Sequence, residues 1–291
     1  MTGERSWMRT SHLKMMNRKD AYKYGIELLS KANITDAAID AGLLLEYAAH
    51  VSKSDIYAHG DMMLSDEEYE RYVEALEMRA KHMPLQYITG TTEFMGLEFD
   101  VDDNVLIPRA DTEILVEEVM RLGLSGMRIL DVCTGSGCIL LSLLHYSNEC
   151  KGVGIDISDK ALEVASHNAE KLGLNATFVK SDMFESLSDE KFDIIVSNPP
   201  YIQTEVIEGL DIEVKDYEPR LALDGDSDGL KFYRIIAKEA GAHLLPEGHL
   251  FLEIGYDEGE DVKELLSNDG YREISIIKDY AGLDRVVHAI R

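Results

Sequence analysis

The spacing of apolar residues along the first part of the chain is that of amphipathic helices. From residue 20 to residue 83 apolar side chains recur every three or four positions, and no proline interrupts the pattern. Ser65, followed three residues later by Glu68, predicts the start of a helix that runs toward Arg79. We therefore predict a helical domain over residues 20–83, preceded by an extension, residues 1–19, that has no clear period.

The pattern changes at Pro84, where β-branched and aromatic residues replace the helical period. Gly90, Gly96 and Asn104 punctuate this stretch, which is typical of short strands joined by turns. We predict a β-hairpin linker over residues 84–112.

After the linker, apolar runs of strand length alternate with helical segments. The runs are Arg128–Val132, Gly152–Ile157, Ala176–Lys180, Phe192–Ser197 and His249–Ile254. Helical periods at 158–172 and 229–244 lie between them, an alternation that predicts a doubly wound, Rossmann-like α/β domain with a mainly parallel sheet. Two last strand-like runs, 271–278 and 285–290, predict an antiparallel edge. The predicted α/β domain spans residues 113–291.

The formal charge of −26 narrows the class of partner. A strongly acidic protein lacks the broad Lys and Arg surface that supplies most nonspecific affinity for phosphate backbones. We therefore favour a protein substrate and expect no direct contact with nucleic acid.

The chain shows neither a membrane span nor a secretory signal. No run of 18 apolar residues occurs, and the first fifteen residues mix charged and apolar side chains without the apolar core of a signal peptide. We expect no membrane contact, a cytoplasmic location and a monomer.

Two patterns that resemble metal sites are incomplete. Cys133, Cys138 and Cys150 form no CxxC pair and have no accompanying histidine cluster, so we interpret them as reduced thiols. The segment 224–229 matches the first half of an EF-hand loop, but Ile235 stands where a bidentate glutamate is required. We expect no metal ion.

A glycine-rich segment, Asp131-Val-Cys-Thr-Gly-Ser-Gly137, follows the first strand of the predicted α/β domain. Gly135 and Gly137 allow the backbone to bend sharply and to approach a ligand closely. Asp156 ends the next strand, where a carboxylate can accept both hydroxyls of a ribose, and Asp182 follows the third. S-adenosylmethionine suits this set, with adenine and ribose near the two aspartates and the methionine part against the loop.

Two other interpretations of the glycine segment have less support. An NAD site requires a third small residue, and Leu140 stands there instead. A structural turn without a ligand explains the glycines alone, but it does not explain their pairing with Asp156 and Asp182.

The tetrapeptide Asn198-Pro199-Pro200-Tyr201 directly follows another predicted strand and so lies at the same edge of the sheet. An amide or exocyclic amino nitrogen is a poor nucleophile because its lone pair is delocalised. Acceptance of its two N–H hydrogens, by the Asn198 side chain and the Pro199 carbonyl, would hold the nitrogen with its lone pair toward a methyl donor. The prolines lack N–H groups, and Tyr201 offers a flat face for a planar group. The pattern predicts a methyltransferase that acts on a planar nitrogen, by positioning and desolvation.

Together these residues resemble the protein N5-glutamine methyltransferases of the HemK/PrmC type, over nearly the whole chain from residue 20. The landmarks, in addition to the glycine segment and the tetrapeptide, are Pro84–Gly90, Glu93-Phe94, Leu106–Glu113, Gly154–Ser158, Glu218–Leu223 and Asp284–Val287. The family modifies the glutamine of the Gly-Gly-Gln motif in peptide chain release factors. It implies a small helical domain for substrate recognition, a β-hairpin linker and a seven-stranded catalytic domain.

The resemblance also implies roles for individual residues. Those expected to contact the cofactor are Phe94, Cys133, Thr134, Gly135, Ser136, Gly137, Asp156, Asp182, Met183 and Asn198. Those expected to bind the glutamine amide are Asn198, Pro199, Pro200 and Tyr201, with Arg109 in a structural or substrate-facing role. Two positions depart from the family: Cys133 often is glycine, so its turn must tolerate a side chain, and Met183 is tryptophan in some members. The product is S-adenosylhomocysteine.

Three alternatives remain at this level. The substrate could be a glutamine of a ribosomal protein, or a base of a nucleic acid, because amino methyltransferases use a similar tetrapeptide on a flipped base. The chain could also be a binding protein that has kept a methyltransferase fold without its chemistry.

Overall fold

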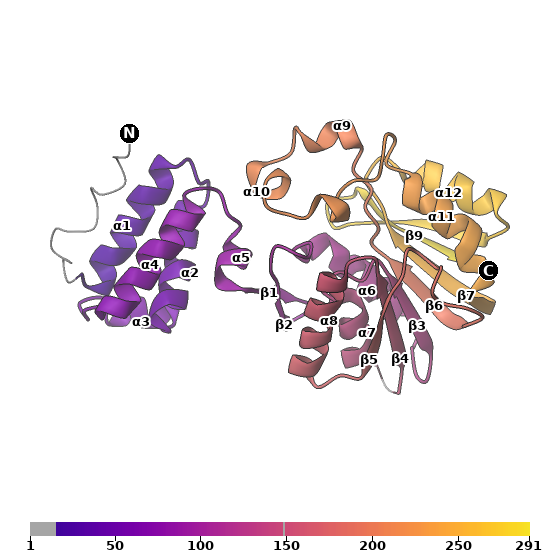
Figure 1. Cartoon of the computed structure of the whole chain (residues 1–291), viewed down its shortest axis with the longest axis horizontal. Coiled ribbons are helices and arrows are strands. Elements are labelled where there is room, and N and C mark those ends of the chain that lie inside the picture. Colours follow the sequence, from indigo (N-terminus) through magenta and orange to yellow (C-terminus); the bar gives the residue numbers. More distant parts are fainter. Residues whose placement is uncertain (1–15, 148) are drawn as a thin grey trace, which may run out of the picture. The chain divides into compact units, whose positions relative to one another are not determined.

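The computed structural model describes residues 16–147 and 149–291, and within them the chain divides between Thr89 and Gly90 into two compact units (Figure 1). No helix in the described ranges is long and apolar enough to span a membrane.

The first unit, over residues 16–89, consists of helices. They are α1 (Arg18–Lys31), α2 (Ala37–Ala49), α3 (Lys53–Ala58), α4 (Asp66–Arg79) and α5 (Leu85–Thr89). The predicted capping box of α4 is confirmed: the Ser65 backbone N–H donates to Glu68 at 2.7 Å, and the Glu68 N–H donates to the Ser65 hydroxyl at 3.2 Å. The helical character predicted for residues 20–83 is also confirmed.

The core of the helical unit includes buried polar side chains that form hydrogen bonds and an ion pair. Tyr72 is fully buried and its hydroxyl donates to the Ala41 carbonyl at 3.1 Å. A buried ion pair joins Arg79 of α4 to Asp40 of α2 at 2.6 Å. Removal of either charge would leave the other buried without its partner, so the pair ties these two helices to each other.

The second unit begins with a two-stranded antiparallel hairpin, β1 (Thr91–Phe94) and β2 (Leu97–Asp100). The predicted hairpin is therefore confirmed within the linker stretch. The residues just before it, 85–89, form helix α5, which the β-branched pattern did not predict.

A seven-stranded sheet is the centre of residues 90–147 and 149–291. Its strands are β3 (Arg128–Val132), β4 (Lys151–Asp156), β5 (Ala176–Lys180), β6 (Phe192–Ser197), β7 (Leu244–Glu253), β8 (Arg272–Lys278) and β9 (Asp284–Ile290). Their order is β5-β4-β3-β6-β7-β9-β8. The first five are parallel, and β9 pairs antiparallel with both β7 and β8, so β9 lies inside the sheet and β8 forms its edge. The predicted Rossmann-like fold is confirmed.

Helices cover both faces of the sheet. One core forms with α11 (Lys231–Glu239) and α12 (Gly259–Asn268), and the other with α6 (Glu113–Met120) and α7 (Cys138–Tyr146). Helix α8 (Asp159–Leu172) follows β4, and the short helices α9 (Thr204–Ile207) and α10 (Ile212–Lys215) lie between β6 and α11.

The strand order reverses at β3. The chain builds β3, β4 and β5 outward in one direction and then returns to place β6 on the other side of β3. In open α/β sheets ligands bind beyond the carboxyl ends of the strands at such a reversal. The glycine segment after β3 and the tetrapeptide after β6 therefore flank this position.

Candidate active site

A cavity of about 440 Å³ opens at the carboxyl ends of β3, β4, β5 and β6. Its lining includes most of the residues predicted to hold a cofactor: Cys133, Thr134, Gly135, Ser136, Asp156, Asp182, Met183 and Asn198. The fold thus brings together side chains and loops that four separate strand ends contribute.

The glycine loop, residues 133–137, has a backbone that depends on its glycines. Gly135 and Gly137 have φ of 53° and 79°, in the left-handed region that glycine adopts without strain. A Cβ on Gly137 would also lie 3.2 Å from the side chains of Ala165 and Leu141. A Cβ built on Gly135, in contrast, would meet no atom of the described chain within 4 Å. The backbone of Gly135 therefore borders open space at the cavity.

Cys133 adopts φ of 61°, which is unusual for a residue with a side chain. The turn therefore tolerates a side chain at this position, where members of the resembled family often have glycine. Burial raises the pKa of the Cys133 thiol, and the nearby carboxylates of Asp156 and Asp131 act in the same direction. The thiol is therefore neutral and is not an activated nucleophile.

Asp156 holds the glycine loop from the end of β4. Its carboxylate accepts the Gly135 N–H at 3.0 Å and the Ser158 N–H at 2.9 Å. Burial raises the pKa of this group, while the hydrogen bonds from the backbone lower it. The Asp156 carboxylate thus lines the cavity and is held there by two backbone N–H donors.

Asp131 supports the loop from beneath. It is fully buried, and its Oδ2 accepts a hydrogen bond from the Thr134 hydroxyl at 2.6 Å. Burial raises the pKa of Asp131 to about 7, and the bond from Thr134 opposes that effect.

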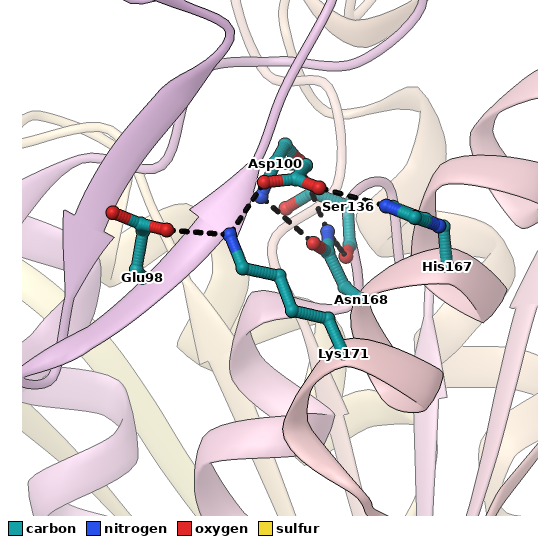
Figure 2. Close-up of polar contacts among 6 residues, drawn as sticks. All are labelled: Glu98, Asp100, Ser136, His167, Asn168 and Lys171. Carbon is teal, nitrogen blue, oxygen red and sulfur yellow. Dashed lines mark hydrogen bonds and ion pairs between the residues drawn. The ribbon is translucent and has the colours of Figure 1, made fainter. Parts of the chain in front are cut away.

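The linker hairpin is also joined to the glycine loop, through the fully buried side chain of Asn168 on α8 (Figure 2). The Asn168 Nδ2 donates to the Ser136 carbonyl at 2.9 Å and to the Asp100 carbonyl at 3.0 Å, and Oδ1 accepts the Asp100 N–H at 2.8 Å. His167 and Lys171 of the same helix contact the Asp100 carboxylate at 2.8 and 2.5 Å. One side chain thus connects the β2 backbone to the loop.

The structure places Phe94 elsewhere than predicted. Its side chain is 1% exposed and packs edge-on against Phe99, with ring centroids 6.1 Å apart, in the core on the α6 and α7 face. It does not line the cavity. The hairpin turns this apolar ring into the core and away from the cavity lining. Gly137 likewise supports the loop and does not line the cavity.

The tetrapeptide divides into residues at the cavity and residues behind it. Asn198 and Pro200 line the cavity, while Pro199 is buried and Tyr201 packs against the core on the α11 face. The Tyr201 hydroxyl donates to Glu253 Oε1 at 3.4 Å. Tyr201 is half-buried, and its side chain packs against the core on the α11 face.

The segment that follows the tetrapeptide keeps it in place. The Ile202 N–H donates to the Leu223 carbonyl at 2.9 Å, and the Gly225 N–H donates to the Ile202 carbonyl at 2.8 Å. A Cβ on Gly225 would lie 2.7 Å from the Tyr201 Cα, so only glycine fits. The landmark at 218–223 is thus adjacent to the tetrapeptide in space.

Arg109 lines the cavity and forms an ion pair with Glu218, whose side chain is 1% exposed. Burial raises the pKa of Glu218, and the Arg109 guanidinium opposes that effect. The pair joins the loop that contains Pro108 to the segment that contains Pro219, and both prolines line the cavity. Arg109 therefore has a structural role, because its ion pair with Glu218 connects these two segments.

Among the residues at this site to which sequence reasoning assigned no individual role are Ile157, Thr112 and Glu253. Ile157 lines the cavity and is 44% exposed, and an exposed apolar residue directly after a strand's last carboxylate is a usable signal. Thr112 lies 3.4 Å from the Asn198 side chain, and Glu253 lies beneath Tyr201. Thr112 lies within the landmark Leu106–Glu113, but its contact with Asn198, like that of Glu253 with Tyr201, could not be predicted, because the partners are 86 and 52 residues apart.

No group of three or more His, Cys, Asp and Glu side chains in the described ranges is arranged to hold a metal ion. The lining instead offers carboxylates at Asp103, Asp156 and Asp182, cations at Arg109 and Lys231, and many apolar side chains. Such a cavity suits an elongated organic molecule with a polar sugar and a flat apolar part.

Comparisons with known proteins agree with this geometry. Residues 20–90 match the family described as the PrmC N-terminal domain, and residues 124–242 match a methyltransferase domain. The chain is 42% identical to a release factor glutamine methyltransferase of Geobacter sulfurreducens, over 89% of this chain and 91% of that protein. It is 40% identical to a protein of the same name from Clostridium acetobutylicum, over 95% and 99%. A methyltransferase structure from Pyrococcus furiosus, 21% identical, covers 68% of this chain and 90% of its own with a TM-score of 0.52, which supports the fold.

Proposed function

The chain belongs to the release factor glutamine methyltransferase family, and we propose that it transfers a methyl group from S-adenosylmethionine to the glutamine side-chain nitrogen in the Gly-Gly-Gln motif of class I peptide chain release factors. The observation that carries the proposal is the position of Asn198, which lines the same cavity as the glycine loop and Asp156.

The cavity fits S-adenosylmethionine. Asp156 and Asp182 would face the ribose and adenine, and Ile157 and Met183 offer apolar contacts for the flat base. The free space beside Gly135 would admit the methionine part close to the loop backbone. When bound, the cofactor supplies an activated methyl group on a sulfonium, and its product would be S-adenosylhomocysteine.

The residues of the chain itself would position the acceptor nitrogen. The Asn198 Nδ2 donates toward Thr112, which leaves its Oδ1 to accept an N–H of the glutamine amide. The Pro199 carbonyl would accept the second N–H. With both hydrogens held, the nitrogen lone pair is directed away from the protein acceptors. No strong general base is needed, because the nitrogen becomes acidic once it is alkylated, so catalysis rests on positioning in a site that excludes water.

Mass spectrometry of a release factor incubated with the enzyme and S-adenosylmethionine tests the proposal. We expect a gain of one methyl group on the Gly-Gly-Gln glutamine, lost in Asn198→Ala while calorimetry still detects cofactor binding. A release factor with Ala in place of that glutamine serves as the substrate control.

Three other outcomes would redirect the assignment. Methylation of a ribosomal-protein glutamine, with the release factor unmodified, would keep the chemistry and change the substrate. Labelling of RNA or DNA, with no labelled protein, would overturn the assignment to an amide nitrogen. Absence of any cofactor binding would favour a protein that uses the fold without the reaction.

A further inference from the structure

Residues 109–113 join four parts of the second unit that are far apart in the sequence. They include a short 3₁₀ turn, Ala110–Thr112, and the first residue of α6. Each of the four polar side chains in this segment contacts a different partner. The pairs are Arg109 with Glu218, Asp111 with Arg285, Thr112 with Asn198, and Glu113 with the Met95 N–H. The segment therefore meets the 218–223 segment, β9, the tetrapeptide and the turn of the hairpin.

Two residues of this segment form part of the cavity wall. Arg109 and Thr112 line the cavity. Thr112 is 2% exposed, and its Oγ1 accepts from the Asn198 Nδ2 at 3.4 Å. Contacts of this length in a ligand-free site tighten when a substrate is bound. A shift of the turn would therefore move the cavity wall and its contact with Asn198 together.

A turn this short has few hydrogen bonds of its own. The Thr112 N–H donates to the Arg109 carbonyl at 3.1 Å, and hydrogen bonds of the 3₁₀ type have poorer geometry than those of an α-helix. Contacts with neighbouring elements therefore decide where the turn lies.

Arg285 of β9 anchors the turn. Its side chain is 12% exposed, and its Nη2 lies 3.2 Å from the Asp111 Oδ2 and 3.1 Å from the Asp279 Oδ2. Asp279 is itself fixed, because its Oδ1 accepts the N–H groups of Ala281 and Leu283, both at 2.9 Å. A planar guanidinium that is held by one such carboxylate offers Asp111 a donor at a defined position.

We propose that Arg285 and Asp111 are positioning residues that hold the turn Ala110–Thr112 at the cavity wall, so that Thr112 keeps the Asn198 amide in place for the acceptor nitrogen. This role rests on the proposed methylation of an amide nitrogen. Neither Arg285 nor Asp111 belongs to the described lining of the cavity, so neither is placed to touch the reacting atoms. Both act through the turn.

The exposure of Asp111 allows position to be separated from stability. Its side chain is 58% exposed, and an ion pair with an exposed carboxylate contributes little to the stability of a fold. Reaction rates depend more steeply on position, because a displacement of about 1 Å can cost about a hundredfold. Loss of the Asp111 carboxylate should therefore slow the reaction in a protein that remains folded.

Asp111→Ala is the central test. We expect kcat for methylation of a release factor, with both substrates saturating, to fall about tenfold because the turn loses its anchor. The cofactor Kd should change by less than about twofold, and Tm should fall by less than about 3 °C. Asp111→Glu keeps a carboxylate at this exposed position and should recover most of kcat.

Arg285→Met and a matched control complete the test. Arg285→Met should lower kcat at least as much as Asp111→Ala and should also lower Tm, because Asp279 loses its partner. Since Arg285 and Asp111 act through one ion pair, the double variant should be no slower than the slower single variant. Glu190→Ala removes another exposed carboxylate from its pair with an arginine, Arg128, and should leave kcat within about twofold of wild type.

Specific results would overturn the proposal. Wild-type kcat in Asp111→Ala, or a double variant in which the two losses multiply, would show that the ion pair does not position the turn for catalysis. Loss of cofactor affinity or of Tm in step with kcat in Asp111→Ala would indicate a general structural role. If wild type methylates no amide at all, the proposed function fails instead. An active wild type with an equally active Asp111→Ala variant confines the failure to this proposal.

Discussion

The side-chain amide of Asn168 donates to the backbone carbonyl of Ser136 at 2.9 Å, and so helix α8 holds the glycine loop in place (Figure 2). The same amide also donates to the Asp100 carbonyl in the linker hairpin and accepts from the Asp100 N–H. Any shift of the hairpin against α8 therefore disturbs the hydrogen bonds that position the loop.

We expect Asn168→Asp to weaken cofactor binding and stability together. A carboxylate at this position would face two carbonyl oxygens and lose both donated hydrogen bonds, at a cost of about 2–4 kcal/mol in the free energy of unfolding. Calorimetry with S-adenosylmethionine and urea unfolding measure the two effects. His167→Ala, which removes an exposed contact to the same Asp100, is the matched control and should change unfolding by less than about 1 kcal/mol. A variant with normal affinity would show that the loop holds its shape without Asn168.

We expect Asp156→Asn to reduce cofactor affinity by about ten- to a hundredfold, or about 1.4–2.8 kcal/mol. The carboxylate accepts two backbone N–H groups, and an amide would have one oxygen and one donor group for the same contacts. Asp159→Asn, three residues later and exposed, is the control and should bind the cofactor normally. Unchanged affinity in Asp156→Asn would remove this residue from the proposed ribose site.

The buried ion pair between Arg79 and Asp40 predicts a large effect on the helical unit. Arg79→Met should lower the free energy of unfolding by about 3–5 kcal/mol, because it leaves the Asp40 carboxylate buried without its charge partner. Circular dichroism during urea unfolding measures this loss. Arg79→Met with Asp40→Leu should recover most of the stability, whereas Arg121→Met, which removes an exposed arginine from its pair with Glu118, should have little effect. Equal losses in the single and double variants would contradict the role of the uncompensated charge.

Two stacked histidines between β7 and β9 predict a stability loss in acid. The His249 Nδ1 and the His288 Nε2 lie 2.9 Å apart, and burial lowers the pKa of both, that of His288 to about 4. Between pH 6.5 and about 4 the unfolded chain binds more protons at His288 than the folded one. The contribution of His288 is therefore complete above pH 6.5 and is lost as the pH falls toward 4.

The substitution His288→Phe should flatten this dependence. Phe keeps the stacking on Phe251, where ring centroids are 4.3 Å apart, but it cannot take up a proton. We expect its Tm to fall less than that of wild type between pH 7 and pH 4.5, as measured by differential scanning calorimetry. An exposed histidine, changed in His59→Gln, should leave the wild-type slope. Parallel Tm curves for wild type and His288→Phe would disprove the assignment.

The sequence by itself determined the local structure and showed which strands the glycine loop and the tetrapeptide follow. Helical spacing, the Ser65 and Glu68 capping box and the apolar strand runs depend on neighbours within a few residues, and the structure confirms them. The glycine loop and the tetrapeptide could be placed at one edge of the sheet because parallel strands put their carboxyl ends together.

Only the tertiary structure decided which side chains meet. Periodicity shows which face of an element is buried, but not what that face packs against. Phe94 has an apolar ring that suits a core or a cofactor pocket equally, and the packing of the hairpin put it in the core. Arg109 with Glu218 and Thr112 with Asn198 are 109 and 86 residues apart, and no local pattern predicts such pairs. The contact of Tyr201 with Glu253 likewise follows from the pairing of β6 with β7 in the sheet. The partners of a side chain depend on which elements pack together, and local sequence patterns do not specify that packing.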